Sequence, residues 1–262
     1  MRRIEPALVP VVTDLERGLR ELGIPFGIVG ALVPELLLPA RPAQMTNDAD
    51  VIVVVESLVD FETLKDRLAD FGFTRTRVSH RMQHRSGGFV DLLPFSDSMA
   101  PGGRLQLEDG FVLNMAGFGQ VVPHALPTEI EGGPTLPLAP LPLYALLKLV
   151  AFSDRKQSKD LAGVFHCLQH YLEDDERRYG AEHQGEGVPY EYTCAHLLGT
   201  DGRRFLDPLL SEAVAGVLDR FSGPDAEVIG IVAREKGRAR IEDEEGSEIV
   251  EHFRWYRLGA GL

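Results

Sequence analysis

The sequence has only two cysteines, Cys167 and Cys194, among its 262 residues. Two thiols so far apart in sequence give neither a disulfide framework nor a zinc site of the Cys-x-x-Cys type. The sequence also lacks a run of about 18 uninterrupted apolar residues, and its first residues carry acids and prolines where a signal peptide needs an apolar segment. We therefore expect reduced thiols, no membrane partner and a cytoplasmic protein.

Basic residues are scarce relative to acidic ones. The chain has 27 Lys and Arg against 40 Asp and Glu, which gives a formal net charge of -13. Indiscriminate nucleic-acid binding is disfavoured, because counterion release from phosphates needs a basic surface, although a local basic patch is compatible with this balance. The sequence contains no Walker phosphate loop, no Rossmann glycine fingerprint and no Gly-x-Ser-x-Gly motif.

The apolar pattern changes in character along the chain. It predicts a helix over residues 5–22, a strand over 24–30 followed by a helix, and a strand over 50–55 that is apolar on both faces. A helix from about residue 57 and a hairpin of strands, with its turn at Gly87 and Gly88, follow. Two weaker strands are expected near 104–107 and 110–115, before a proline- and glycine-rich stretch over 126–142 that reads as a boundary.

Beyond that stretch the apolar stripes are helical. The predicted fold class is therefore α/β (α+β), with a first domain containing a mixed sheet over residues 1–135 and a mostly helical carboxy-terminal domain over residues 136–262.

Two aspartates stand at the mouth of the apolar strand in the segment TNDADVIVVV. Asp48 and Asp50 are two residues apart on a strand, so their side chains share a face and can converge on one divalent cation. By itself, such a pair is more often a solvated strand end. Asp91 changes this weighing, because it lies in the apolar segment FVDLLPF, where an unpaired carboxylate would pay several kcal/mol of desolvation. If these two strands pair, all three carboxylates face one cleft, enough for two metals and in-line phosphoryl transfer.

Gly30 ends the predicted strand over residues 24–30 and opens a helix. A glycine at such a turn lets a phosphate approach the backbone closely, and the free N–H groups of a helix start favour an anion. A lone glycine there is more often simply a turn. Its position, a loop's length ahead of the aspartate pair, gives it weight.

These features together resemble the nucleotidyltransferase superfamily with the polymerase-beta-like fold, whose signature is an apolar residue, Gly, then Gly or Ser, followed by Asp-x-Asp and a third downstream acid. The segment LLKLVAFSDRKQSKDLAGVFHCL in the second half resembles the helical signature of the AbiEii-like nucleotidyltransferases, toxins of type IV toxin–antitoxin and abortive-infection systems that include the MenT-type toxins. The similarity spans about residues 24–172. Two features depart from the pattern: Ala31 replaces the second Gly or Ser, and Arg41 precedes Thr46 by more residues than usual.

The resemblance implies a Mg²⁺-dependent transfer of a nucleoside monophosphate from a nucleoside triphosphate to an acceptor hydroxyl, with release of pyrophosphate. It implies that two Mg²⁺ ions are held by Asp48, Asp50 and Asp91. It also implies a tRNA 3′ end or other RNA as acceptor and a cognate antitoxin as partner. An antibiotic- or protein-modifying enzyme is an alternative, and a catalytically inactive nucleotide-binding interaction module is another, motivated by Ala31.

The resemblance also assigns the nucleotide-binding residues. They are Gly30, Ala31, Lys148, Arg155 and Lys159. The three basic side chains would neutralise phosphate charge. The alternative for these three is an ordinary solvated helix face.

The segment TRTRVSHRMQHR concentrates basic residues in an otherwise acidic chain. Its arginines are Arg75, Arg77, Arg81 and Arg85. They could contact an RNA acceptor or the nucleotide, because the segment leads directly into the strand that carries Asp91. They could equally be edge-strand charges that prevent aggregation.

Overall fold

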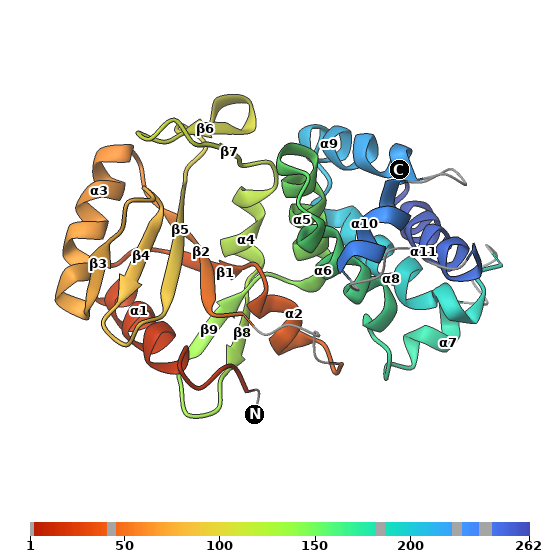
Figure 1. Ribbon diagram of the computed structural model, residues 1–262, viewed down its shortest axis with the longest axis horizontal. Coiled ribbons are helices and arrows are strands. Elements are labelled where there is room, and N and C mark those ends of the chain that lie inside the picture. The colour runs from red at the N-terminus through yellow and green to blue at the C-terminus, as the bar shows by residue number, and fades with distance from the viewer. Residues whose placement is uncertain (1–2, 41–45, 182–186, 222–226, 236–242) are drawn as a thin grey trace. The chain divides into compact units, whose positions relative to one another are not determined.

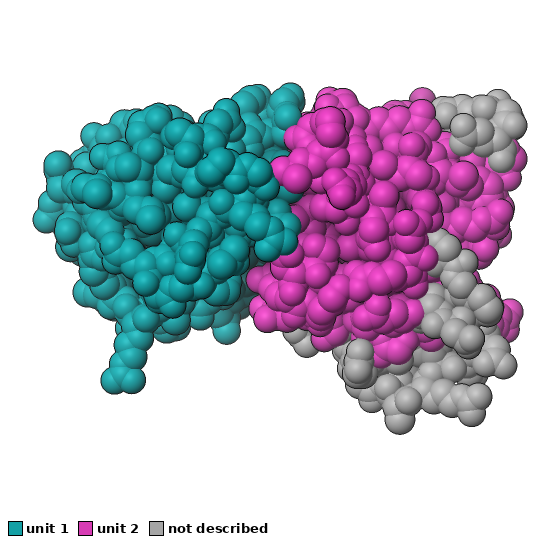
Figure 2. Space-filling view, turned by 90° about the horizontal axis from the view of Figure 1, so that it is seen from above, with its two compact units in different colours: residues 1–36, 43–140 teal, residues 37–42, 141–262 magenta. Residues whose placement is uncertain are grey.

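The computed structural model of the chain describes residues 3–40, 46–181, 187–221, 227–235 and 243–262. The chain divides into two compact units, one of residues 1–36 with 43–140 and the other of residues 37–42 with 141–262 (Figure 2). The sequence predicts a division after residue 135, whereas the first unit extends to Pro140. This difference arises because a further strand, β9 (Thr135–Leu138), belongs to the sheet of the first unit.

The first unit contains a mixed sheet, as predicted, and the described residues contribute seven strands to it. The strands lie side by side in the order β3 (Phe73–Arg75), β4 (Arg81–His84), β5 (Phe89–Phe95), β2 (Asp48–Val54), β1 (Phe26–Val29), β9 and β8 (Leu126–Glu129) (Figure 1). The β2–β5 and β1–β9 pairs are parallel, and the other neighbours are antiparallel. Val51, Ile52 and Val53 are fully buried. Strand β2 is therefore covered on both faces, as its apolar sequence predicts.

Helices and a small second sheet complete this unit. The helices are α1 (Val9–Glu21), α2 (Leu32–Leu37, which ends at the division between the units), α3 (Leu58–Arg67) and α4 (Val121–His124). The predicted apolar stripe of α1 is buried, and α3 begins at Ser57, whose hydroxyl accepts a hydrogen bond from the Asp60 N–H. The two weaker predicted strands are β6 (Arg104–Gln106) and β7 (Val112–Asn114), which pair only with each other.

The proline- and glycine-rich stretch expected to be a boundary is a hairpin of β8 and β9 for most of its length. Pro127 and Pro137 lie opposite each other in it, and β8 is the edge strand. A proline cannot donate a ladder hydrogen bond, so it is tolerated at an edge. Pro127 lies on this edge strand and Pro137 on its neighbour β9, and the division between the two units follows at Pro140, within the same stretch.

The described residues of the second unit form helices and the segments that connect them, consistent with the mostly helical domain that was predicted. Its helices are α5 (Leu141–Arg155), α6 (Ser158–His170), α7 (Arg177–Ala181), α8 (Thr193–Gly202), α9 (Pro208–Leu218), α10 (Glu227–Glu235) and α11 (Asp243–Ala260). Cys167 and Cys194 are both buried and free. In the part of the chain that the structure describes, no helix has the length and apolar character needed to cross a membrane.

Two glycines bring the backbones of α8 and α11 into contact. A Cβ added at Gly199 would lie 2.7 Å from the Ala260 backbone nitrogen, and one added at Gly259 would lie 2.9 Å from the His196 carbonyl carbon. Neighbouring backbone cannot yield as a flexible side chain can. The two helices therefore pack closely only because both positions lack a side chain.

We expect Gly199→Ala to lower the free energy of unfolding of the second unit by about 2 kcal/mol or more, because the new methyl group overpacks a backbone contact. The matched control is Gly216→Ala on α9, where an added Cβ meets nothing within 4 Å. That change should stabilise the same unit by about 0.5–1 kcal/mol through helix propensity. Urea unfolding followed by the fluorescence of Trp255, the chain's one tryptophan, measures both, and a Gly199→Ala protein as stable as the control would contradict the packing argument.

Candidate active site

The end of β1 and the first residues of β2 and β5 lie side by side in the middle of the sheet. Val29, the last residue of β1, lies opposite Asp50 on the antiparallel strand β2, and Asp50 lies opposite Asp91 on the parallel strand β5. Asp48 lies two residues before Asp50 on the same strand and therefore on the same face. The predicted pairing of the two aspartate-bearing strands is confirmed, and it aligns the three carboxylates on neighbouring strands.

Gly30 follows β1 and lies directly against Asp50. Its φ of +77° is in the left-handed region, and an added Cβ would stand 2.7 Å from the Asp50 Cγ. Its carbonyl accepts a hydrogen bond from the Val33 N–H at 3.1 Å, which opens helix α2. Glycine is therefore needed here for two reasons, the backbone conformation and the space that the Asp50 carboxylate fills. Nucleotide binding by Gly30 and Ala31 stays a prediction, and Arg41 lies outside the described residues.

Asp48 is oriented by a neighbouring hydroxyl. The Thr46 hydroxyl donates a hydrogen bond to Asp48 Oδ1 at 2.7 Å and accepts one from the Asp48 N–H at 3.3 Å. The side chain of Asp48 is 39% exposed, whereas that of Asp91 is 11% exposed. The three carboxylates therefore range from half-buried to nearly buried, and Asp91 is the one whose charge most needs a partner.

That partner is Arg81 on β4, the residue directly opposite Asp91 in the hairpin. The Arg81 Nε and Nη2 atoms donate to the two Asp91 oxygens, each at 2.7 Å, and Nη2 also donates to Asp48 Oδ2 at 3.1 Å. The hydrogen bond to Asp91, together with the charges of Asp91, Asp48 and Asp50, raises the pKa of Arg81 above its ordinary value, although burial opposes this. One guanidinium thus stands among all three carboxylates.

The carboxylate oxygens are the hard donors that Mg²⁺ prefers. Arg81 is a cation already bound by two of the three aspartates, so the site is one that accepts positive charge. In the conformation of the described residues, no three acidic, histidine or cysteine side chains are grouped closely enough to ligate a single ion. The donor types fit a divalent metal, and in this conformation the Arg81 guanidinium lies between Asp48 and Asp91.

The other predicted acceptor-contact arginines do not gather with Arg81. Arg75 is ion-paired with Glu62 and, at 2.8 Å, with Asp66, and Arg85 is ion-paired with Asp14 at 2.6 Å. Arg77 is exposed. The segment therefore does not present one continuous basic surface, and contact with an acceptor stays a prediction.

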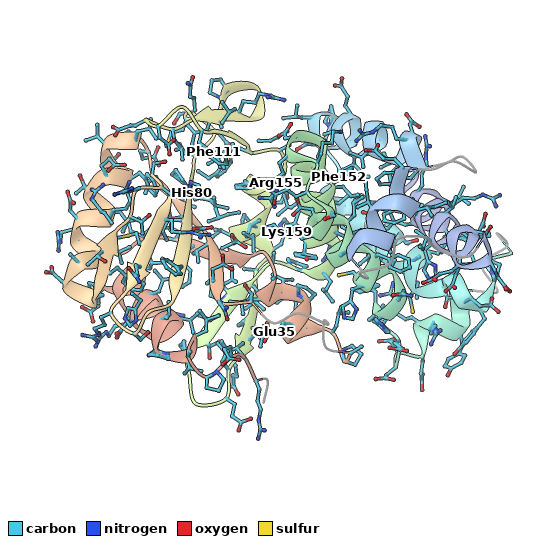
Figure 3. The ribbon with its side chains drawn as sticks, viewed as in Figure 1. Glu35, His80, Phe111, Phe152, Arg155 and Lys159 are labelled. Carbon is cyan, nitrogen blue, oxygen red and sulfur yellow. The ribbon has the colours of Figure 1, made fainter. Side chains whose placement is uncertain are left out.

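A histidine that sequence reasoning did not single out lies near the carboxylates. His80 precedes Arg81, and its ring stacks on Phe111 with centroids 5.1 Å apart (Figure 3). Burial lowers the pKa of His80. The nearby negative charge of Asp91 acts in the opposite direction but is the smaller effect. Nothing in the sequence pattern distinguished His80 from the neighbouring His84.

Two of the three predicted phosphate ligands of the second unit share one buried acid. Asp160 is fully buried, and its carboxylate accepts hydrogen bonds from Arg155 Nε at 2.7 Å and from Lys148 Nζ at 3.2 Å. Burial alone would raise the pKa of Asp160, but these two cations outweigh it and hold the pKa below its ordinary value. Lys159, on α6, is exposed (Figure 3). Their roles in binding phosphate stay predictions.

Neither a family model nor a curated protein sequence matches the chain. Among solved structures, it is similar to an antigenic nucleotidyltransferase-like protein from Paracoccidioides brasiliensis, at 15% identity and a TM-score of 0.43 over 91% of this chain and 96% of that one. It is also similar to the antibiotic-resistance factor ANT(2'')-Ia, at 10% identity and a TM-score of 0.38 over 83% of this chain and 95% of that one.

A third similar structure is the CdnE cyclic dinucleotide synthase of Elizabethkingia meningoseptica with GTP and Apcpp, at 7% identity and a TM-score of 0.32 over 100% of this chain and 93% of that one. All three TM-scores lie below 0.5. These likenesses therefore do not decide the family or the activity of this chain.

We expect Gly30→Ala to destabilise the first unit by more than the roughly 1–2 kcal/mol that a left-handed backbone conformation costs, because the methyl group also collides with Asp50. Gly23→Ala is the matched control, since Gly23 has a φ of +70° but nothing within 4 Å of an added Cβ. Urea unfolding measures the total loss of stability of each variant. Hydrogen exchange of the β1 and β2 amides reports the local effect of the collision with Asp50. The collision argument predicts that Asp50→Ala relieves the extra cost in the double variant; equal losses at Gly30 and Gly23 would contradict it.

We expect Asp160→Asn to lower the free energy of unfolding of the second unit by about 3 kcal/mol, because it leaves Lys148 and Arg155 without their shared counter-ion. The folded-state pKa of Asp160 is lowered, so this contribution is present above about pH 4 and is lost as the pH falls through the folded-state pKa. The difference in free energy of unfolding between Asp160→Asn and the unmodified protein should therefore become smaller at acidic pH. Trp255 fluorescence during urea unfolding measures it. Exposed Glu212→Gln on α9 is the control, and an equal effect there would rule out a special role for Asp160.

Proposed function

We propose that the chain is a metal-dependent nucleotidyltransferase, which transfers a nucleoside monophosphate from a nucleoside triphosphate to an acceptor hydroxyl. One observation carries the proposal. Asp48 and Asp50 on β2 and Asp91 on the adjacent β5 are aligned on one face of the sheet, beside the end of β1 and the Gly30 that follows it. Three carboxylates held together against their mutual repulsion are an arrangement suited to binding cations.

Asp48, Asp50 and Asp91 would hold the metal, for which we predict two Mg²⁺ ions. When bound, Mg²⁺ supplies charge neutralisation on the triphosphate and lowers the pKa of the acceptor hydroxyl. The Thr46 hydroxyl fixes the orientation of Asp48, and Gly30 leaves the space that Asp50 fills. These two contacts preorganise the carboxylates, so their orientation costs little when substrate binds.

In the proposed reaction, the acceptor oxygen attacks the α-phosphorus as the bond to the β-phosphate oxygen breaks, and pyrophosphate leaves. The acceptor loses one proton, which an Asp91 carboxylate oxygen would take. Lys148, Arg155 and Lys159 would neutralise phosphate charge, as the resemblance implies.

The nature of the acceptor is the finer part of the proposal. Arg75, Arg81 and Arg85 are all engaged by carboxylates of the chain itself, and the net charge is -13. Both features favour a small-molecule or protein hydroxyl over RNA, because an RNA strand needs unpaired basic side chains along its path. A tRNA 3′ end, a toxin role and an antitoxin partner stay predictions from the sequence resemblance.

The test incubates the protein with Mg²⁺ and each α-labelled nucleoside triphosphate, in separate reactions with total RNA, cellular protein and hydroxyl-bearing antibiotics. We expect pyrophosphate release together with label on one class of acceptor. Asp50→Asn should reduce transfer about a hundredfold or more, because the change keeps the shape beside Gly30 and removes the charge. The control is Asp70→Asn, an exposed acid of the same unit, which should keep full activity.

Each other outcome has a separate meaning. Transfer that survives Asp50→Asn would contradict the proposed site. Calorimetric binding of a triphosphate without pyrophosphate release would instead identify the inactive nucleotide-binding module. Label on RNA alone would reverse the preference for a small-molecule or protein acceptor.

A further inference from the structure

Arg81 binds the carboxylates of both Asp48 and Asp91. The two oxygens of Asp91 each accept a hydrogen bond from Arg81 at 2.7 Å, and Asp48 Oδ2 accepts one at 3.1 Å. The remaining oxygen of this pair, Asp48 Oδ1, accepts from Thr46 at 2.7 Å. All four oxygens of Asp48 and Asp91 thus have a partner within the chain.

A metal ion would need the same oxygens. The Arg81 Nη2 atom donates to both Asp48 Oδ2 and Asp91 Oδ2, so the guanidinium lies between two of the carboxylates that would hold the ion. A guanidinium and a divalent cation cannot lie between the same pair of oxygens, because they would overlap and repel each other. The Arg81 side chain is 35% exposed, so its charged end has solvent to move into.

We propose that Arg81 is the resident counter-ion of this site and that it is exchanged for the metal. The Arg81 ion pairs and the metal-bound site are alternative states of Asp48 and Asp91. This inference rests on the proposed function, because it concerns the metal of that site. Arg81 is in these terms a positioning residue: it holds Asp91 in place without metal, and its release leaves a guanidinium, a preferred ligand of phosphate, beside the carboxylates.

The exchange has a thermodynamic consequence. Metal binding by Asp48 and Asp91 would displace Arg81 from two charge-assisted hydrogen bonds at Asp91 and one at Asp48, so Arg81 lowers the apparent metal affinity. Removing Arg81 should therefore tighten metal binding, because the metal no longer competes with a guanidinium for the same carboxylates. A residue with a purely structural role would have the opposite effect, since its loss would disorder the ligands and weaken binding.

The test is the affinity of the nucleotide-free protein for Mn²⁺, measured by electron paramagnetic resonance. We expect Arg81→Gln to bind Mn²⁺ about tenfold or more tightly than the unmodified protein. The matched control is Arg75→Gln, which removes an arginine of the same segment that pairs with Glu62 and Asp66. It should leave the affinity unchanged, and Asp48→Asn should weaken binding with or without Arg81.

A second measurement does not depend on a variant that folds. In the unmodified protein, the nuclear magnetic resonance signal of the Arg81 Nε–H should shift as Mg²⁺ is added, with the same midpoint as metal binding. Equal or weaker Mn²⁺ binding by Arg81→Gln would overturn the exchange, as would an unchanged Arg81 signal at saturating Mg²⁺. If neither the unmodified protein nor Arg81→Gln binds Mn²⁺, the proposed metal-dependent function is contradicted too. Binding by both proteins without the gain in affinity would contradict the exchange alone.

Discussion

Three carboxylates at one edge of a buried sheet repel one another, and this repulsion is the constraint on which the first unit depends. Asp91 cannot carry its charge in an apolar strand without a cation beside it. Strand β4 supplies that cation in Arg81, Thr46 holds Asp48, and Gly30 leaves space for Asp50. Arg81 is placed by the pairing of β4 with β5, Thr46 lies just before β2 and Gly30 just after β1, so the strand order β4, β5, β2, β1 brings all three to the carboxylates.

Much of the fold could be predicted from local patterns. The apolar residues of β2 on both faces indicated a covered central strand, and the spacing over residues 5–22 indicated α1. The pairing of β1 with β9, more than a hundred residues later, carries no local signal, because both are short apolar segments that could pair with several partners. The hairpin of β8 and β9 was not predicted, because its prolines suit a linker as well as an edge strand, and the division between the units follows it, after Pro140.

The acidic part of the candidate site was accessible to sequence reasoning, and its basic partner was not. Two aspartates at a spacing of two and a third in an apolar strand predict convergence once the strands pair. Arg81 was grouped with Arg75, Arg77 and Arg85 by proximity in sequence alone. The register that brings Arg81 opposite Asp91 follows from the hydrogen bond between His84 and Gly88 across the turn, which only the structure shows. Similarly, the spacing of Lys148 and Arg155 placed them on one helix face, but only the packing of α6 on α5 shows that they share Asp160.

Successive side chains of β2 point to opposite faces of the sheet, so the register of β2 decides whether both of its aspartates reach the site. Asp48 and Asp50 face the site, whereas Ala49 between them is completely buried on the opposite face. A slip of β2 by one residue against its neighbours would drive two charges into the apolar interior and turn the small side chain of Ala49 toward Arg81. The aspartates that form the site therefore destabilise a sheet in which β2 is out of register, and so they favour the native strand pairing.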